Sequence, residues 1–205
     1  MIFVRVPVYI ALLHDPMTNR LGERVTTAVT NMDIHDISRS ARTYGVSGYF
    51  LVTPLDEQHR LVGRILGHWQ GESSKRWHPK RFDALSLTRL AKNFDEVKSA
   101  IRSVHGEDPE VVMPDARPLP NSISYAAYRA ELSRPGRTRP AVLVFGTGWG
   151  IHESFYPEVH RILVPVYGPK RNDPDAGDGT EVTKRYNHLS VRAAAAIIMD
   201  RLFGE

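Results

Sequence analysis

The chain has 205 residues, 41% of them hydrophobic and 24% charged, as in an ordinary globular protein rather than a disordered one. It contains no cysteine, which excludes disulfides, thiolate metal ligands and cysteine nucleophiles. No apolar run approaches the roughly 20 residues needed to cross a bilayer, and residues 1–14 lack a signal-peptide cleavage pattern. We therefore expect a soluble, cytoplasmic protein with no membrane partner, built as one domain over residues 1–205.

The hydrophobic pattern alternates strands with helices, which predicts an α/β fold with a mostly parallel sheet covered by helices on both faces. The predicted strands are 6–13, 48–53, 85–90, 110–113, 141–145 and 162–167. The predicted helices are 33–44, capped by Asp33, 56–69, 94–105, 124–132 and 191–202. A basic loop is expected between the second helix and the third strand, and a mobile loop over residues 169–184.

The formal net charge is only +4, but basic residues gather between residues 60 and 92 beside Trp69, Trp77 and Phe82. Cations next to aromatic rings suit a polyanion with bases that can stack, so this stretch is a candidate RNA-binding surface. A solvated helix face followed by a loop is the alternative. Further candidates for phosphate contacts are Arg117, Arg129, Arg134, Arg137 and Arg139.

Three loops follow predicted strands closely, and parallel sheets bind ligands at the carboxyl ends of their strands. They are residues 114–117, the segment Gly146-Thr147-Gly148-Trp149-Gly150, and the segment beginning at Val166. The glycines of the second loop would let a ligand approach the backbone, although a tight turn also favours glycine. Walker A spacing and the Gly-x-Gly-x-x-Gly pattern are absent, which removes the main support for ATPase or dinucleotide-dehydrogenase activity.

The last predicted helix opens with the polar segment Tyr186-Asn187-His188-Leu189-Ser190-Val191-Arg192. Asn187 or Ser190 alone would serve as an N-cap, but a helix start needs no such cluster of polar side chains. His188 has no second histidine or carboxylate at a spacing that suits a metal, so no metal site is expected.

The closing motifs resemble those of SPOUT methyltransferases. They are Gly146-Thr147-Gly148-Trp149-Gly150, Val164-Pro165-Val166-Tyr167-Gly168 and Asn187-His188-Leu189-Ser190-Val191-Arg192-Ala193-Ala194. Segments 26–31, 33–37 and 41–45 are also similar to a small bacterial group of S-adenosylmethionine (SAM)-dependent RNA methyltransferases, so the resemblance covers nearly the whole chain.

The resemblance implies a sheet with a deep trefoil knot in its C-terminal part, about residues 110–205, which would hold SAM as the cofactor. It also implies a homodimer with the active site near the subunit interface, and RNA (tRNA or rRNA) as the substrate. The implied cofactor-binding residues are Phe145, Gly146, Thr147, Gly148, Val164, Pro165, Tyr167, Gly168, Asn187 and Leu189.

The candidate catalytic residues are Arg39, Asp36 and Ser190. In the ribose-methylating branch an arginine lies six residues before a glycine, as Arg39 and Gly45 do here. Arg39 would orient a ribose 2′-hydroxyl, whereas Asp36 or Asp115 would accept a proton from a base nitrogen. That branch usually has asparagine at the position of Asp33 and a glutamate in the second motif, so both acceptors remain open.

Three alternatives accompany this interpretation. The chain would be a non-catalytic module of the same fold that binds SAM and RNA, a methyltransferase for a non-RNA acceptor, or a plain doubly wound domain with a nucleotide pocket. The first predicts cofactor binding without methyl transfer, and the second predicts activity that survives ribonuclease.

Overall fold

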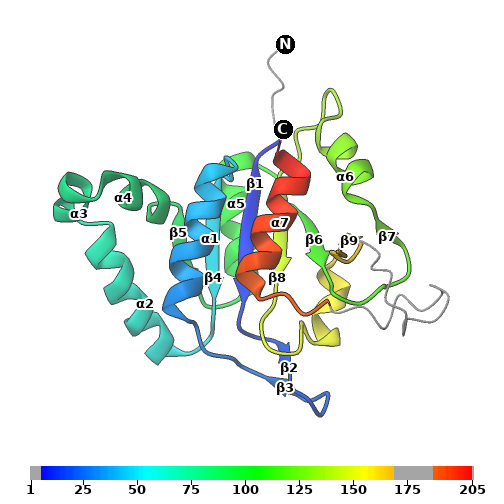
Figure 1. Cartoon of the computed structure of the whole chain (residues 1–205), viewed down its shortest axis with the longest axis horizontal. Coiled ribbons are helices and arrows are strands. Elements are labelled where there is room, and N and C mark those ends of the chain that lie inside the picture. Colours follow the sequence, from blue (N-terminus) through cyan, green and yellow to red (C-terminus); the bar gives the residue numbers. More distant parts are fainter. Residues whose placement is uncertain (1–5, 169–186, 205) are drawn as a thin grey trace.

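The computed structural model describes residues 6–168 and 187–204, and its centre is a seven-stranded sheet (Figure 1). Every neighbouring pair of strands in this sheet is parallel. The strand order is β5-β4-β1-β8-β6-β9-β7. The strands are β1 (Val8–Leu13), β4 (Gly48–Val52), β5 (Thr88–Ala91), β6 (Glu110–Pro114), β7 (Ser122–Ile123), β8 (Ala141–Phe145) and β9 (Arg161–Leu163). The predicted mostly parallel sheet is confirmed.

Two strands enter the sheet between strands that precede them in the chain. β8 lies between β1 and β6, and β9 lies between β6 and β7. The chain then returns through residues 169–186, which lie outside the described residues, to α7 (Val191–Phe203). The predicted knot depends on that path, as does the predicted loop over 169–184, so both stay predictions.

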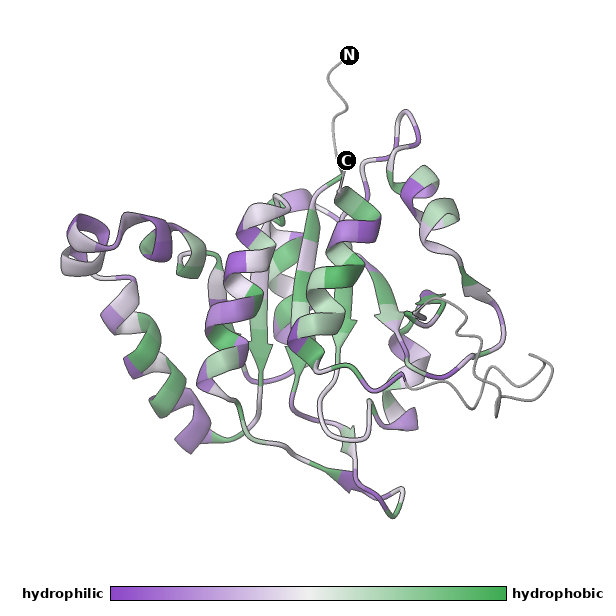
Figure 2. Cartoon of the chain, in the orientation of Figure 1, coloured by the Kyte–Doolittle hydropathy of each residue, from purple (hydrophilic) through white to green (hydrophobic). Residues whose placement is uncertain are grey.

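Helices cover both faces of the sheet, as predicted. α1 (Asn31–Thr43), α6 (Tyr125–Leu132) and α7 pack on one face, and α5 (Phe94–His105) and the 3₁₀ helix η1 (Glu153–Glu158) pack on the other. Successive strand residues point to opposite faces, so Leu12 joins the first core while Ala11 joins the second. Figure 2 shows the apolar residues concentrated in the strands and α7.

The expected basic loop is wrong, because most of that stretch is helical. α2 (Asp56–Trp69), α3 (Glu72–Trp77) and α4 (Pro79–Leu85) form an arm beside the β5 edge of the sheet (Figure 1). Pro79 starts α4 with its φ already suited to a first helical position. Leu85, predicted to begin a strand, is instead buried at the end of α4, and the strand starts at Thr88.

Two other boundaries also differ from prediction. The N-cap of α1 is Thr30 rather than Asp33, since the Thr30 hydroxyl accepts from the N–H of Asp33 and donates to its carboxylate. β9 ends at Leu163 instead of continuing to Tyr167, because Pro165 has no N–H to donate to a neighbouring strand.

A small hairpin, β2 (Met17–Thr18) with β3 (Arg24–Val25), was not predicted. No helix within the described ranges is long and apolar enough to cross a membrane.

Candidate active site and cofactor site

The carboxyl ends of β1, β6, β8 and β9 meet at one edge of the sheet. The register pairs Leu12 with Phe145 and Pro114 with Leu163. All three loops predicted to bind a ligand therefore leave the sheet at the same edge. This is the edge where open α/β sheets bind their ligands.

The loop after β8 is held by the unpredicted hairpin. The N–H of Thr18 donates to the carbonyl of Gly150 over 2.9 Å, and the N–H of Trp149 donates to the carbonyl of Thr18 over 3.3 Å. Gly148 and Gly150 have φ values of 60° and 104°, which favour glycine. At Gly146 an added Cβ would lie 2.5 Å from Cγ1 of Ile151, so the lack of a side chain there serves packing.

A chain of hydrogen-bonded polar side chains, partly buried, connects the end of β1 to this loop. His14 Nδ1 lies 3.0 Å from the Thr27 hydroxyl, which lies 2.5 Å from the Thr147 hydroxyl. His14 is completely buried, and burial lowers its pKa to about 4 despite the nearby Asp33. The imidazole is therefore neutral at physiological pH. Sequence reasoning missed His14 because a single histidine at the end of an apolar strand carries no motif.

Side chains from other elements hold the third loop and the segment before α7. The Tyr125 hydroxyl donates to the carbonyl of Val164 over 2.8 Å, and Arg201 donates to the carbonyl of Tyr167 over 3.4 Å. The Asn187 amide donates to the carbonyl of Ala116 over 2.7 Å. The structure thus holds the predicted cofactor segment 164–168 against α6 and α7, and places Asn187 of the segment 187–189 beside the loop after β6.

The backbone of these segments suits SAM, whose adenine is expected to be held by backbone groups. Among the described residues, the N–H groups of Gly148, Val166 and Tyr167 have no protein acceptor. An added Cβ at Gly168 would meet no described atom within 4 Å, which leaves open space beside the third loop. Within the described ranges these segments therefore present N–H groups without a protein acceptor, and the contribution of each predicted cofactor residue stays a prediction.

Arg192 connects the start of α7 to α1 through two ion pairs. Its guanidinium lies 3.4 Å from Asp33 Oδ1 and 3.5 Å from Asp36 Oδ2. Asp33 is buried, whereas the side chain of Asp36 is 55% exposed and accessible to a substrate. The pairing explains why a carboxylate suits position 33, where the ribose-methylating branch usually has asparagine: it anchors Arg192.

The three predicted catalytic residues lie in different settings. Arg39 follows Asp36 by about one turn of α1, and both line a groove between α1 and the arm. Within the described part of the chain, Arg39 forms no ion pair. The Ser190 hydroxyl is the N-cap of α7, accepting from the N–H of Ala193 over 3.3 Å. The N-cap alternative accounts for Ser190, and its catalytic role stays a prediction.

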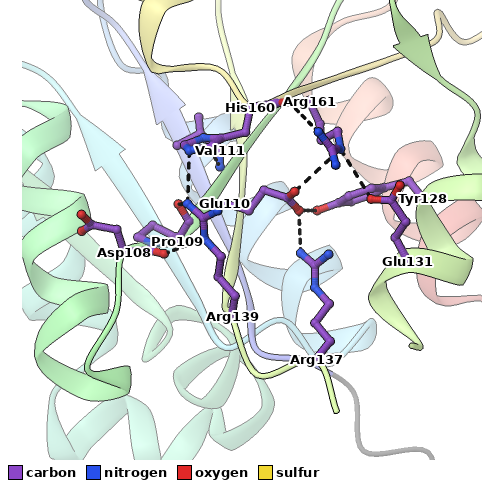
Figure 3. Close-up of polar contacts among 10 residues, drawn as sticks. All are labelled: Asp108, Pro109, Glu110, Val111, Tyr128, Glu131, Arg137, Arg139, His160 and Arg161. Atoms are coloured by element: carbon purple, nitrogen blue, oxygen red, sulfur yellow. Dashed lines mark hydrogen bonds and ion pairs between the residues drawn. The ribbon is translucent and has the colours of Figure 1, made fainter. Parts of the chain in front are cut away.

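Several arginines predicted to contact phosphates are engaged with other groups. Figure 3 shows Arg137 and Arg161 around Glu110 at the opposite, amino edge of the sheet. Arg139 donates to the carbonyls of Asp108 and Pro109. Burial by itself raises the pKa of Glu110, but hydrogen bonds from Arg137 and Tyr128 hold it below its ordinary value. The charged side chains of this cluster therefore pair with one another and stabilise the sheet at its amino end.

The remaining candidates differ in how far they are engaged. Arg117 is bound by Asp115 and Tyr156, and Arg129 donates to the carbonyl of Gly204. Arg134 has no side-chain partner within the described ranges.

No group of three or more histidine, aspartate or glutamate side chains in the described part of the chain is placed to hold a metal ion.

Comparison with known proteins decides the family. A family described as SAM-dependent RNA methyltransferase matches residues 7–204. The chain belongs to this family. Its cofactor class, SAM, and its reaction class, methyl transfer to RNA, agree with the resemblance of its motifs. The acceptor atom and the acceptor RNA are finer questions that family membership leaves open.

Individual relatives agree with this family. An uncharacterized protein of Aquifex aeolicus (strain VF5) is 40% identical over 202 residues, which are 98% of this chain and 91% of the relative. A tRNA (guanine-N(1)-)-methyltransferase of Nitratidesulfovibrio vulgaris is 40% identical over 200 residues, covering 96% of this chain. This chain spans only 42% of that relative's length, so the relative's name does not locate its activity in the matched part.

The fold is that of the SpoU type. The SpoU methyltransferase AviRb from Streptomyces viridochromogenes superimposes with a TM-score of 0.53, over 97% of this chain and 59% of that one. The sequence identity is 13%, so this likeness concerns the fold alone. The plain doubly wound domain considered from the sequence is therefore replaced by a SPOUT-type methyltransferase fold.

Proposed function

We propose that this SAM-dependent RNA methyltransferase acts on tRNA, with the acceptor atom brought to the surface formed by α1 and the start of α7. The double contact of Arg192 with Asp33 and Asp36 carries this proposal, since it joins the predicted cofactor segment 187–189 to the helix that bears Asp36 and Arg39. tRNA is the first acceptor to test because it appears in the name of a relative that is 40% identical.

The residues of this chain would act mainly by orientation. When bound, SAM supplies an electrophilic methyl group on a sulfonium. The segments 146–148, 164–168 and 187–189 would hold the cofactor through backbone groups, and Arg39 would bind the acceptor oxygen and stabilise the charge that develops on it. Arg39 has no ion pair among the described residues, whereas Asp36 already meets Arg192. This difference favours a ribose hydroxyl as the acceptor, with a base nitrogen as the alternative.

Calorimetric titration with SAM and S-adenosylhomocysteine tests the cofactor site. We expect micromolar binding to the wild-type chain and its loss in Gly168→Val, because the new side chain would enter the open space beside the third loop without displacing a described atom. Gly146→Val is a poor test, since its Cβ would clash with Ile151. Absence of binding to the wild-type chain would contradict the proposal.

Transfer of labelled methyl from SAM to purified tRNA and total RNA tests the reaction. Arg39→Ala should abolish turnover and leave SAM affinity within a few fold, because Arg39 would touch only the acceptor. Arg42→Ala, one turn along the same helix and paired with Asp83, is the control and should stay active. Nucleoside analysis of the product then distinguishes a 2′-O-methyl ribose from a methylated base.

Each other outcome has a clear meaning. SAM binding without transfer to any cellular RNA would support the non-catalytic module, and transfer that survives ribonuclease would support a non-RNA acceptor. Equal turnover in Arg39→Ala and the wild-type chain would remove Arg39 from the mechanism.

We also propose that the protein acts as a homodimer in the cytoplasm, where tRNA is available. Large apolar side chains that are exposed in the single chain support the dimer. Four of them are 42–71% exposed. They are Leu21 in the hairpin, Met32 at the start of α1, Trp149 in the loop after β8 and Leu189 just before α7. A second subunit on this edge would cover them and complete the site.

A further inference from the structure

A groove separates α1 from the arm that α2, α3 and α4 form. Its volume is about 620 Å³, large enough for a nucleotide rather than for a single ion. One wall is α1, with His35, Asp36 and Arg39, and the other is the arm, with Arg64, Trp69 and Arg81 among its residues. Asp36 and Arg39, two of the predicted catalytic residues, thus lie on the wall that faces the arm.

The charges in this groove are unbalanced. Arg39, Arg64 and Arg81 line it with only one carboxylate, Asp36, which already pairs with Arg192. Two cations of the arm outside the groove have carboxylate partners: Arg60 pairs with Glu57, and Lys75 lies 3.8 Å from Glu72. Within the described residues, none of the three groove arginines has an ion pair. An anionic ligand would supply the missing negative charge.

The wall formed by the arm is aromatic as well as cationic. Trp69 lies half-buried with the Arg81 guanidinium 4.6 Å from the centre of its ring, and three histidine rings pack at steep angles to it with centroids 4.9–5.8 Å away. His35 Nδ1 is buried without a hydrogen-bond partner in the described part of the chain. Burial first, and the nearby Arg81 and Arg39 next, keep the pKa of His35 below its ordinary value. The groove thus combines aromatic rings with positive charge.

We propose that this groove binds an unpaired nucleotide of the acceptor RNA, with its base against Trp69 and its phosphates on Arg64 and Arg81. Rings beside guanidinium groups are the usual means of holding an unstacked RNA base, and a paired base would stay inside its duplex. This inference rests on the proposed function, because it assigns the RNA of that reaction to a surface next to Arg39. The arm is then the part of the fold that holds the substrate.

The first experiment measures binding of a short fluorescein-labelled single-stranded RNA of mixed sequence by anisotropy over a range of salt. Arg64→Ala should weaken binding about five- to tenfold at low salt and reduce the slope of log K against log[salt] by roughly 0.7, the share of one phosphate on a single strand. Arg60→Ala is the matched control, since Arg60 lies one turn away on α2, outside the groove. It should bind like the wild-type chain.

The second experiment uses Trp69 as a reporter. The sequence has three tryptophans, so the Trp77→Phe, Trp149→Phe double variant leaves Trp69 alone. Trp77 is 66% exposed, and phenylalanine keeps an aromatic ring at position 149, where the proposed second subunit would cover the side chain, so the fold should tolerate both changes. Saturating single-stranded RNA should quench the remaining fluorescence, and the same sequence as a duplex should quench it far less.

Any of three outcomes would overturn the assignment of the groove. They are equal RNA affinity in Arg64→Ala and Arg60→Ala, unchanged Trp69 fluorescence on addition of RNA, and equal quenching by single-stranded and duplex RNA. These outcomes are separate from a failure of the proposed function, which would appear as no SAM binding or no methyl transfer in the wild-type chain. A chain that methylates tRNA but binds RNA independently of Arg64 would keep its function and lose this groove.

Discussion

At the scale of single residues, polar side chains near the cofactor edge divide into those that hold the fold and those that face outward. The buried His14 is linked through Thr27 to Thr147, and Asp33 binds both Thr30 and Arg192. Arg39 and Asp36 instead line an open groove. This contrast separates residues whose loss should unfold the site from residues whose loss should stop the reaction.

The buried His14 makes a definite prediction for stability against pH. Because its pKa is about 4 in the folded chain and about 6.5 when unfolded, the unfolded chain binds more protons between these values. The free energy of unfolding should therefore fall as pH drops from about 6.5 to 4, by about 2 kcal/mol at pH 5 from this residue.

Denaturant unfolding of the wild-type chain and His14→Asn at pH 7 and pH 5 measures this contribution. Asparagine keeps a group able to bind Thr27 but does not titrate, so the variant should lose less stability on acidification. Parallel loss in both proteins would mean that His14 is protonated in the folded state.

At the scale of elements, the amino edge of the sheet depends on an ion-pair network that joins β6, α6 and the segment before β8. Glu110 is buried, accepts a hydrogen bond from Tyr128 over 2.9 Å and pairs with Arg137 over 2.5 Å (Figure 3). Arg161 lies farther away, at 3.8 Å. A carboxylate buried in this way must keep its cations.

We predict that Arg137→Ala destabilises the chain by about 2 kcal/mol, because the buried Glu110 would keep its hydrogen bond from Tyr128 but only one cation, the more distant Arg161. Thermal or denaturant unfolding near neutral pH measures this change, and SAM affinity should be unaffected, since the network lies at the edge opposite the cofactor loops. Arg102→Ala, which breaks an exposed pair with Asp108, is the control and should change stability too little to resolve. Equal effects of the two variants would mean that burial of Glu110 is unimportant.

At the scale of the whole molecule, one edge of the sheet carries the loops predicted to bind the cofactor, the unpredicted hairpin and several exposed apolar side chains. At the opposite edge, where the strands begin, the charged side chains around Glu110 pair with one another. The arm extends from the sheet beside β5 and adds a second wall to α1 (Figure 1). This asymmetry agrees with a protein whose subunit contacts and substrate share one side.

Sedimentation equilibrium should give a dimer at micromolar concentration. Leu189→Glu, which places a charge on a side chain that is 42% exposed in the single chain, should shift the equilibrium toward monomer and reduce methyl transfer. Leu55→Glu, on a side chain that is 40% exposed before the arm, is the control and should remain dimeric. A wild-type chain that sediments as a monomer while methylating RNA would contradict the proposed dimer.

The sequence by itself determined the parallel sheet, the two helical layers and the three loops that meet at one edge, because strand and helix periodicities are local and glycine and proline mark their ends. Its motifs also indicated the family and the cofactor. Only the tertiary structure decided which polar residues are engaged. Arg137 and Arg139 looked as free as Arg64 in the sequence, and nothing in it placed Asn187 against Ala116. The partners of these three residues lie at least 27 residues away along the chain, so whether a polar group is engaged or available depends on packing that periodicity does not encode.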